Sequence, residues 1–190
     1  SIMALNTLPA GAFADDAITS AKINLANTFA FTGTVTGTAY DSKLLHIRDE
    51  KTSSTQGGTA TAGDDQIRDL NTVVTNEITG ASLGSNRITL PAGTYYIEAW
   101  AGKYQTDMNR AFLYNQSDSS VTILGHSNFS DDNNQGYMIS FVKGRFTISA
   151  EKLFEIRHYG EKAQSNNGLG ISVADSRTNV YTDVQIWKVA

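Results

Sequence analysis

The stretch that decides the fold of this chain is Ile88-Thr-Leu-Pro-Ala-Gly-Thr-Tyr-Tyr-Ile-Glu-Ala-Trp100. A short β-rich run ends at Pro91, and a longer one follows Gly93. A strand with one face in water alternates apolar and polar residues. In Thr94–Ala101 both faces instead hold large aromatic or aliphatic side chains. The pattern predicts a β-strand with one face in a core and the other face covered by a second surface.

Similar short β-rich runs recur from residue 43 to the end of the chain, separated by segments rich in Gly, Asn, Asp and Ser. Many short strands at this spacing are typical of a sandwich or a barrel. We see no helix pattern and no propeller or solenoid repeat in this part. The predicted strands are Lys43–Arg48, Gln66–Val74, Arg87–Leu90, Thr94–Ala101, Arg110–Asn115, Val121–His126, Tyr137–Ser149, Leu153–Tyr159 and Val180–Val189.

Residues 1–42 differ from the rest because they are small and polar. Ala14–Leu25 fits a helix capped by an aspartate or an extended shaft. Phe29–Thr38 alternates Thr and Val as a β segment does, but its thin side chains cannot form a core alone. We therefore predict two parts, a stalk or anchor at 1–42 and a knob domain at 43–190. The alternative for 1–42 is a floppy tail.

The composition excludes several classes of protein. The net charge is −4 and the 15 Lys and Arg residues are scattered, so we expect no nucleic-acid binding. With no cysteine, disulfides and thiolate metal sites are ruled out, and oligomerisation becomes the natural source of robustness. No apolar stretch approaches the ~20 residues of a membrane helix, so we expect no membrane insertion. The start of the chain lacks the basic region of a signal peptide.

The three histidines do not form a catalytic or metal-binding motif in the sequence. His46, His126 and His158 are not spaced as i and i+4, and each falls within or at the end of a predicted strand. No Gly-x-Ser-x-Gly elbow is present. Gly168-Leu-Gly170 precedes Ile171–Val173, which we read as a strand, so the dinucleotide-binding motif fails. We expect no enzyme activity, no metal and no cofactor.

Paired acidic residues are the remaining candidates for chemistry. Glycosidases use two carboxylates about 5–9.5 Å apart, but adjacent residues on a loop are poorly held for that task. Because aspartate favours turns, turn formation is a better explanation for the adjacent acidic residues of this chain than catalysis. Asp131–Gln135 offers oxygen ligands for calcium but lacks the EF-hand pattern. The pairs are Asp15-Asp16, Asp64-Asp65 and Asp131-Asp132.

Three segments carry a resemblance to known proteins. Ile88–Trp100 resembles the third strand of the jelly rolls of tumour necrosis factor and complement heads. Tyr137–Leu153 resembles the sixth strand of that family, its turn and the entry to the seventh, and Thr182–Val189 occupies the position of a central strand. The resemblance covers residues 43–190 and implies an all-β, antiparallel jelly-roll sandwich. The disulfides and collagen stalk of vertebrate members are absent, so we expect no immune function.

A second resemblance concerns phage fibres. Leu8–Ile23 and Phe31–Gly37 look like stalk segments of phage fibre proteins, and Arg68–Val73 looks like a sequence in fibre tips. This resemblance implies a virion structural protein, assembled in the host cytoplasm, displayed on the virion surface, and attached through residues 1–42 to another virion protein.

The aromatic side chains predict how copies of the chain assemble. The predicted strands in Thr94–Ala101 and Tyr181–Val189 have large aromatic or aliphatic side chains on both faces. One face fills the core and the other meets neighbouring subunits, since Tyr and Trp provide large contact areas with a polar group. The alternative is that they cover loops of a monomer. The residues predicted for a homotrimer interface are Tyr96, Glu98, Trp100, Phe141, Tyr181 and Trp187.

The loops predict which end of the knob faces outward. Strands of a jelly roll run up and down, so a stalk at one end places the loops at 49–65, 102–109, 127–136 and 160–179 at the other. These loops are long and polar, and binding usually resides in such loops. Their amides, carboxylates and tyrosines suit sugar hydroxyls and rings; the alternative is solvated loops. The predicted receptor-binding residues are Tyr104, Asp107, Asp131, Asp132, Asn133, Asn134, Gln164, Asn166 and Asn167.

These observations predict a trimeric fibre or spike tip that contacts a host-surface glycan or receptor. One alternative is a capsid decoration or head-fibre protein with a structural role. A second is a glycan-degrading enzyme whose site lies between subunits. The sequence names neither the docking partner of residues 1–42 nor the receptor.

Overall fold

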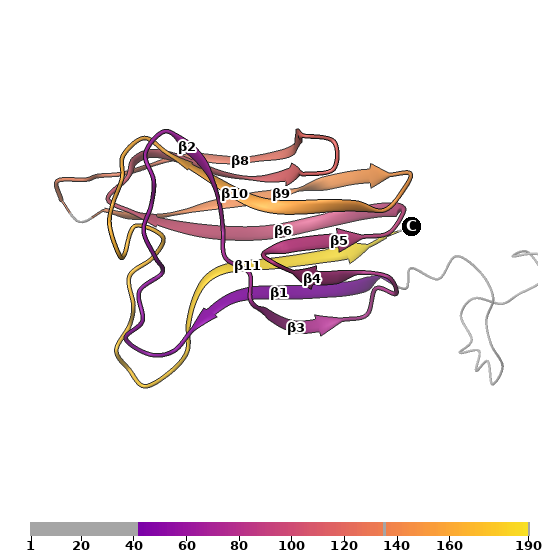
Figure 1. Cartoon of the computed structure of the whole chain (residues 1–190), viewed down its shortest axis with the longest axis horizontal. Coiled ribbons are helices and arrows are strands. Elements are labelled where there is room, and N and C mark those ends of the chain that lie inside the picture. The colour runs from indigo at the N-terminus through magenta and orange to yellow at the C-terminus, as the bar shows by residue number, and fades with distance from the viewer. Residues whose placement is uncertain (1–41, 135, 190) are drawn as a thin grey trace, which may run out of the picture. The chain divides into compact units, whose positions relative to one another are not determined.

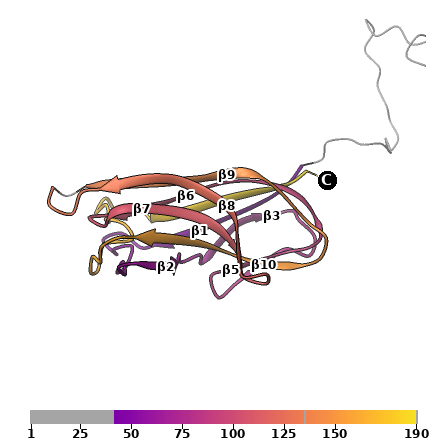
Figure 2. The ribbon, with the colours of Figure 1, turned by 90° about the horizontal axis from the view of Figure 1, so that it is seen from above.

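The computed structural model describes residues 42–134 and 136–189, so the predicted stalk at 1–42 lies outside the described residues except for its last residue. The described residues form eleven strands and no helix (Figures 1 and 2). The strands are β1 (Lys43–Lys51), β2 (Asp64–Ile67), β3 (Thr72–Asn76), β4 (Ser82–Gly84), β5 (Arg87–Leu90), β6 (Gly93–Tyr104), β7 (Asp107–Asn115), β8 (Ser120–Ser130), β9 (Tyr137–Ile148), β10 (Lys152–Gly160) and β11 (Asn179–Lys188).

The strands form two antiparallel sheets. Sheet 1 has the order β3-β1-β11-β6-β9, and sheet 2 has the order β4-β5-β10-β7-β8, with β2 also paired to β10. The C-terminal strand β11 lies in the middle of sheet 1, as the resemblance implied. The predicted antiparallel jelly-roll sandwich is therefore confirmed.

The core lies between the sheets and explains the pattern of Thr94–Ala101. Tyr95, Ile97, Ala99 and Ala101 all point inward from β6 and are at most 3% exposed. Aromatic rings fill the space near the turn between β9 and β10, where Phe146 lies 5.5 Å from Tyr95 between ring centroids. Branched and aromatic side chains from both sheets complete the core: Leu45, Ile47, Ile88, Leu90, Leu113, Val142, Phe154, Ile156, Val184 and Ile186.

Two predictions about strands were wrong. The predicted strand Gln66–Val74 is split, because β2 pairs with β10 in sheet 2 while β3 pairs with β1 in sheet 1. The chain must cross from one sheet to the other between them. Ile171–Val173 forms no strand and belongs to the loop between β10 and β11. The short strand β4 was missed, since its three residues carry no periodic pattern.

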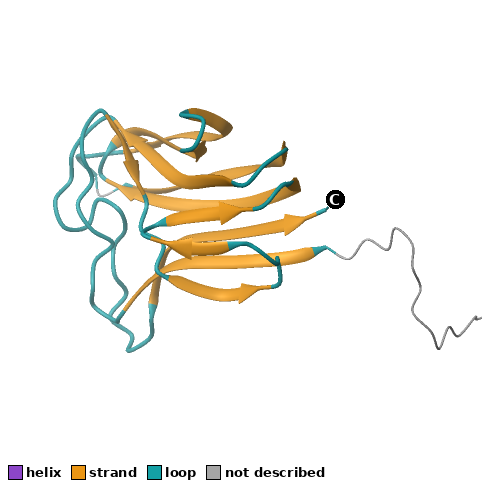
Figure 3. Cartoon of the chain, turned by 45° about the vertical axis from the view of Figure 1, so that its right-hand side comes forward, coloured by secondary structure: helices purple, strands orange, loops and turns teal. Residues whose placement is uncertain are grey.

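Three of the four connections at one end of the sandwich are longer than the β7–β8 and β9–β10 turns at the other end, as predicted (Figure 3). Lys43 pairs with Lys188, so β1 begins at the same end of the sandwich where β11 finishes. The short turns at 116–119 and 149–151 lie at this end. The opposite end carries three longer loops and one two-residue turn, which together we call the far-end cap: residues 52–63, 105–106, 131–134 with 136, and 161–178. The predicted loop at 102–109 was wrong, because β6 continues to Tyr104 and β7 begins at Asp107.

Candidate functional site

The loops of the far-end cap are joined to one another by backbone hydrogen bonds. Gly57 N donates to Gly170 O at 2.8 Å, and Ala60 forms a β-bridge with Gln164. Gln105 N donates to Gly136 O at 2.9 Å, which connects the β6–β7 turn to the β8–β9 loop. Four connections distant in sequence therefore form one ordered surface.

The predicted residues of the β8–β9 loop form a tight polar turn. Asn133 N donates to Asp131 Oδ1 at 2.8 Å, and Asn134 Nδ2 donates to Asp131 Oδ2 at 2.6 Å. The hydrogen bond from Asn134 lowers the pKa of the Asp131 carboxyl. Both Asp131 oxygens thus accept hydrogen bonds within the turn. Among the described residues, no group of three His, Asp or Glu side chains could hold a metal ion.

Lys162 binds two of the predicted acidic residues. Its ammonium lies 3.0 Å from Asp107 Oδ2 and also contacts Asp132 Oδ2. The bond from Lys162 lowers the pKa of Asp107, and the two carboxylates raise the pKa of Lys162. Gln105 Nε2 donates to Asp132 O at 2.9 Å. This group connects the β6–β7, β8–β9 and β10–β11 connections through side chains.

The other predicted receptor-binding residues differ in their exposure. Asn166 is exposed, while Gln164 and Asn167 are half-buried and hydrogen-bonded to each other at 3.0 Å. Tyr104 is only 6% exposed and differs from the prediction, because the loop carrying Gly168 pairs with its backbone. Tyr104 therefore supports the cap from beneath.

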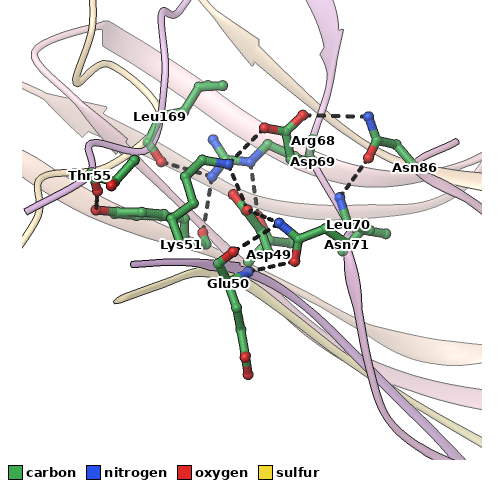
Figure 4. Close-up of polar contacts among 12 residues, drawn as sticks. Asp49, Glu50, Lys51, Thr55, Arg68, Asp69, Leu70, Asn71, Asn86 and Leu169 are labelled. Atoms are coloured by element: carbon green, nitrogen blue, oxygen red, sulfur yellow. Dashed lines mark hydrogen bonds and ion pairs between the residues drawn. The ribbon is translucent and has the colours of Figure 1, made fainter. Parts of the chain in front are cut away.

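Buried polar side chains lie close together between the sheets below the cap, in a region that we call the chamber. Arg68 is fully buried and donates to Gly102 O and to Leu169 O, at 3.1 and 2.8 Å. Arg68 also donates to Thr182 Oγ1 and Tyr181 O, so it joins the cap to sheet 1. Figure 4 shows Arg68 beside Leu169 of the cap. Burial lowers the pKa of its guanidinium.

Lys103 and His158 point into the same chamber and are fully buried. The sequence analysis did not predict that these two residues would be buried close together. One signal was available: Lys103 continues the inward series of Tyr95 to Ala101 by one more alternation in β6. The interior thus changes from apolar to cationic at the far end.

An open groove of about 630 Å³ lies on the cap. Tyr137 of β9 contributes an aromatic side chain that is 38% exposed, and Val173 contributes an apolar surface. Asp175 and Arg177 add an exposed ion pair at 2.8 Å. The groove therefore combines an aromatic ring with hydrogen-bonding groups, as small-molecule sites do. Sequence reasoning assigned none of these residues, because Tyr137 of β9 and the β10–β11 loop are brought together only by the fold.

The outer face of sheet 1 carries most of the predicted interface residues. Tyr96 pairs with Trp187 of β11, and Trp100 pairs with Phe141 of β9. Tyr96 and Phe141 are 36% and 39% exposed, and the two tryptophans are half-buried. We call these four side chains the aromatic face. Predicted Glu98 lies between the two pairs and contacts Lys143 at 3.3 Å.

Tyr181 is the exception among the predicted interface residues. It is 2% exposed, and its hydroxyl donates to Thr55 O in the cap. Gly170 lies against its ring, where a Cβ would approach to 2.1 Å. Loops of the same chain cover Tyr181, so the structure corrects the expectation that it lies open to a neighbouring subunit.

A second apolar surface, which we call the apolar edge, follows β8 along the side of the sandwich. Its side chains are 42–58% exposed, which is unusual for residues of this size. Part of it forms a groove of about 880 Å³. Contiguous exposed apolar surfaces of this kind mark interaction sites. The residues of the apolar edge are Val121, Leu124, Phe129, Met108 and Met138.

Comparison of the sequence with known proteins gives no match. No protein-family model matches the sequence, and no curated protein matches it. Within the described residues, no helix is long and apolar enough to cross a membrane.

Several solved structures have a similar fold, and the match covers nearly the whole length of each of them. Murine APRIL has a TM-score of 0.51 at 9% identity, over 78% of this chain and 99% of that one. The globular domain of zebrafish complement 1qA has a TM-score of 0.52 at 10% identity, over 78% and 98%. Eiger TNF from S. frugiperda has a TM-score of 0.54 at 11% identity, over 78% and 93%. At these identities the likeness shows a jelly roll of the tumour-necrosis-factor and complement-1q type, and the fold alone.

Proposed function

We propose that this chain is a structural protein of a bacteriophage particle, in which three copies form a fibre or spike tip that contacts the host surface. The observation that carries the proposal is the presence of two large apolar surfaces, the aromatic face and the apolar edge, on different sides of one chain. The resemblance of Leu8–Ile23 and Phe31–Gly37 to phage stalks supports the virion part of the proposal.

The two surfaces favour a ring of copies. A contact between different surfaces is heterologous, and it closes into a ring when each copy is rotated by the same fraction of a turn. The aromatic face of one copy would then cover the apolar edge of the next. Each buried side chain would contribute about 1.5–3 kcal/mol. We propose that the ring closes at three.

A charged side chain introduced on the apolar edge tests whether this surface holds the copies together in a ring. We expect Leu124→Glu to convert the trimer to monomers, because Leu124 is 58% exposed and would face the neighbouring copy. Val173→Glu is the matched control, since Val173 is 60% exposed but lies on the cap. Light scattering during size-exclusion chromatography gives the mass of each variant. A trimer that survives Leu124→Glu would contradict this interface.

Host contact would occur through the far-end cap. The long polar loops lie at the end of the sandwich opposite to Lys43, and the groove beside Tyr137 is open to solvent. Aromatic rings with neighbouring amides, carboxylates and guanidinium groups suit sugar rings and hydroxyls. We propose a bacterial surface glycan as the ligand. The fold provides a rigid scaffold for these loops, and the protein requires no catalysis for this role.

A binding assay with purified bacterial surface glycans tests this part. We expect the trimer to bind and Arg177→Ala to weaken binding by about tenfold, which corresponds to ~1.4 kcal/mol. Lys152→Ala, at the end of the sandwich opposite to the cap, should leave binding unchanged. An intact trimer that binds no glycan would contradict host contact and favour a capsid decoration role. Release of sugar from the glycan would instead indicate an enzyme.

A further inference from the structure

Two buried nitrogen atoms in the chamber below the cap have no hydrogen-bond partner among the described residues. These atoms are Lys103 Nζ on β6 and His158 Nδ1 on β10. Both residues are 0% exposed. A buried polar atom that forms no hydrogen bond is strongly destabilising, so native proteins satisfy such atoms with protein groups or with ordered water.

The other nitrogen of His158 fixes the role of Nδ1. Asn109 Nδ2 donates to Asp107 O and to Ser130 Oγ, at 2.9 and 3.1 Å. Asn109 Oδ1 is therefore the atom that faces His158 Nε2, at 3.2 Å. An amide oxygen only accepts, so Nε2 must carry the proton. In a neutral ring Nδ1 is then an acceptor.

The charges around His158 keep its ring neutral. Burial and the nearby cations Arg68 and Lys103 lower its pKa well below the usual 6.5. Lys103 has only donors to offer, whereas His158 Nδ1 offers only a lone pair. An anion would satisfy Lys103 but would repel that lone pair. A water molecule both accepts and donates.

We propose that the chamber binds one structural water molecule, which accepts a hydrogen bond from Lys103 Nζ and donates one to His158 Nδ1. The water connects β6 of sheet 1 to β10 of sheet 2. Gly160 leaves the room that Lys103 needs, because a Cβ there would approach Nζ to 2.5 Å. Buried waters of this kind form about three hydrogen bonds and belong to the fold.

Crystals of the full chain soaked in sodium bromide test the ligand. We expect an oxygen-sized density peak within hydrogen-bond distance of both nitrogens and no anomalous bromide signal in the chamber. A bromide peak there would overturn the proposal in favour of an anion site. Direct contact between the two nitrogens, with no density between them, would overturn it as well.

Nitrogen-15 NMR of labelled histidine tests the tautomer independently in solution. We expect His158 to be neutral at neutral pH, with the proton on Nε2, and to show magnetisation transfer from a long-lived water. A protonated ring, or a proton on Nδ1, would contradict the assigned donor and acceptor.

Lys103→Met tests the role of the lysine, with Lys152→Met at the start of β10, whose ammonium pairs with Asp118 at the surface, as the control. Replacing a buried charge with an apolar side chain of similar shape often stabilises a protein. We expect Lys103→Met to remove the water and raise Tm by on the order of 5 °C, with Lys152→Met nearly unchanged. A water peak that persists in place after Lys103→Met would show that Lys103 is not its ligand.

Discussion

At the scale of single residues, two buried cations and a neutral histidine organise the far end of this molecule. The main core is apolar, but Arg68, Lys103 and His158 occupy the interior beneath the loops. Arg68 satisfies carbonyl groups from β6, β11 and the cap at the same time. Its planar fork of donors suits that geometry, whereas a lysine presents a single point charge.

Removing the Arg68 side chain should strongly lower the free energy of unfolding. In Arg68→Leu the carbonyl groups of Gly102, Tyr181 and Leu169 lose a buried donor, so we expect a loss of on the order of 3–5 kcal/mol in the free energy of unfolding. Arg68→Lys should recover only part of the loss. Urea unfolding measures both. Arg177→Leu is the control, because its side chain is 84% exposed and should change stability by no more than about 0.5 kcal/mol. Equal effects at the two positions would contradict the role given to Arg68.

Lys103 should make stability depend on pH in the alkaline range. Burial lowers its pKa from 10.5 to about 8. Between these values the unfolded chain holds a proton that the folded chain has lost, so stability rises with pH, by at most about 1.4 kcal/mol per unit. We expect urea unfolding to show this rise from about pH 8 towards 10.5, and to show a flatter profile for Lys103→Met. Parallel profiles would rule out a buried, partly deprotonated lysine.

At the scale of elements, the strands were largely predictable and the connections were not. Thr94–Ala101 could be read because its alternation reflects burial within a single strand, β6. The alternation of Gln66–Val74 suggested one strand, yet Arg68 and the residues after it cross between the sheets. The crossing depends on long-range pairing with β10 and β1, which local periodicity does not contain. The groove beside Tyr137 was missed for the same reason.

The cap should depend on close backbone packing at Gly57. A Cβ at Gly57 would lie 2.6 Å from the carbonyl carbon of Leu169, so Gly57→Ala must displace the 164–170 segment. We expect faster hydrogen exchange there with the strands of the sandwich unchanged. Gly84→Ala is the control, since nothing lies within 4 Å of a Cβ at that position. Unchanged exchange in Gly57→Ala would show that the cap does not rely on this contact.

At the scale of the whole molecule, three features are aligned along the strands. The described chain begins at one end of the sandwich, the polar cap lies at the other end, and the aromatic face and apolar edge run along the sides. This arrangement suits the proposed role of a tip that would present its loops outward. The burial of Tyr181 inside its own chain leaves the other aromatic residues as the surface that a neighbouring copy would cover.

The mass of the chain in solution tests the central claim most directly. Light scattering during size-exclusion chromatography at micromolar concentration should give a mass near three times 20.5 kDa. That result would confirm a trimer and support the face-to-edge contact. A single species near 20.5 kDa would contradict the account, because the aromatic face and the apolar edge would then remain exposed to water.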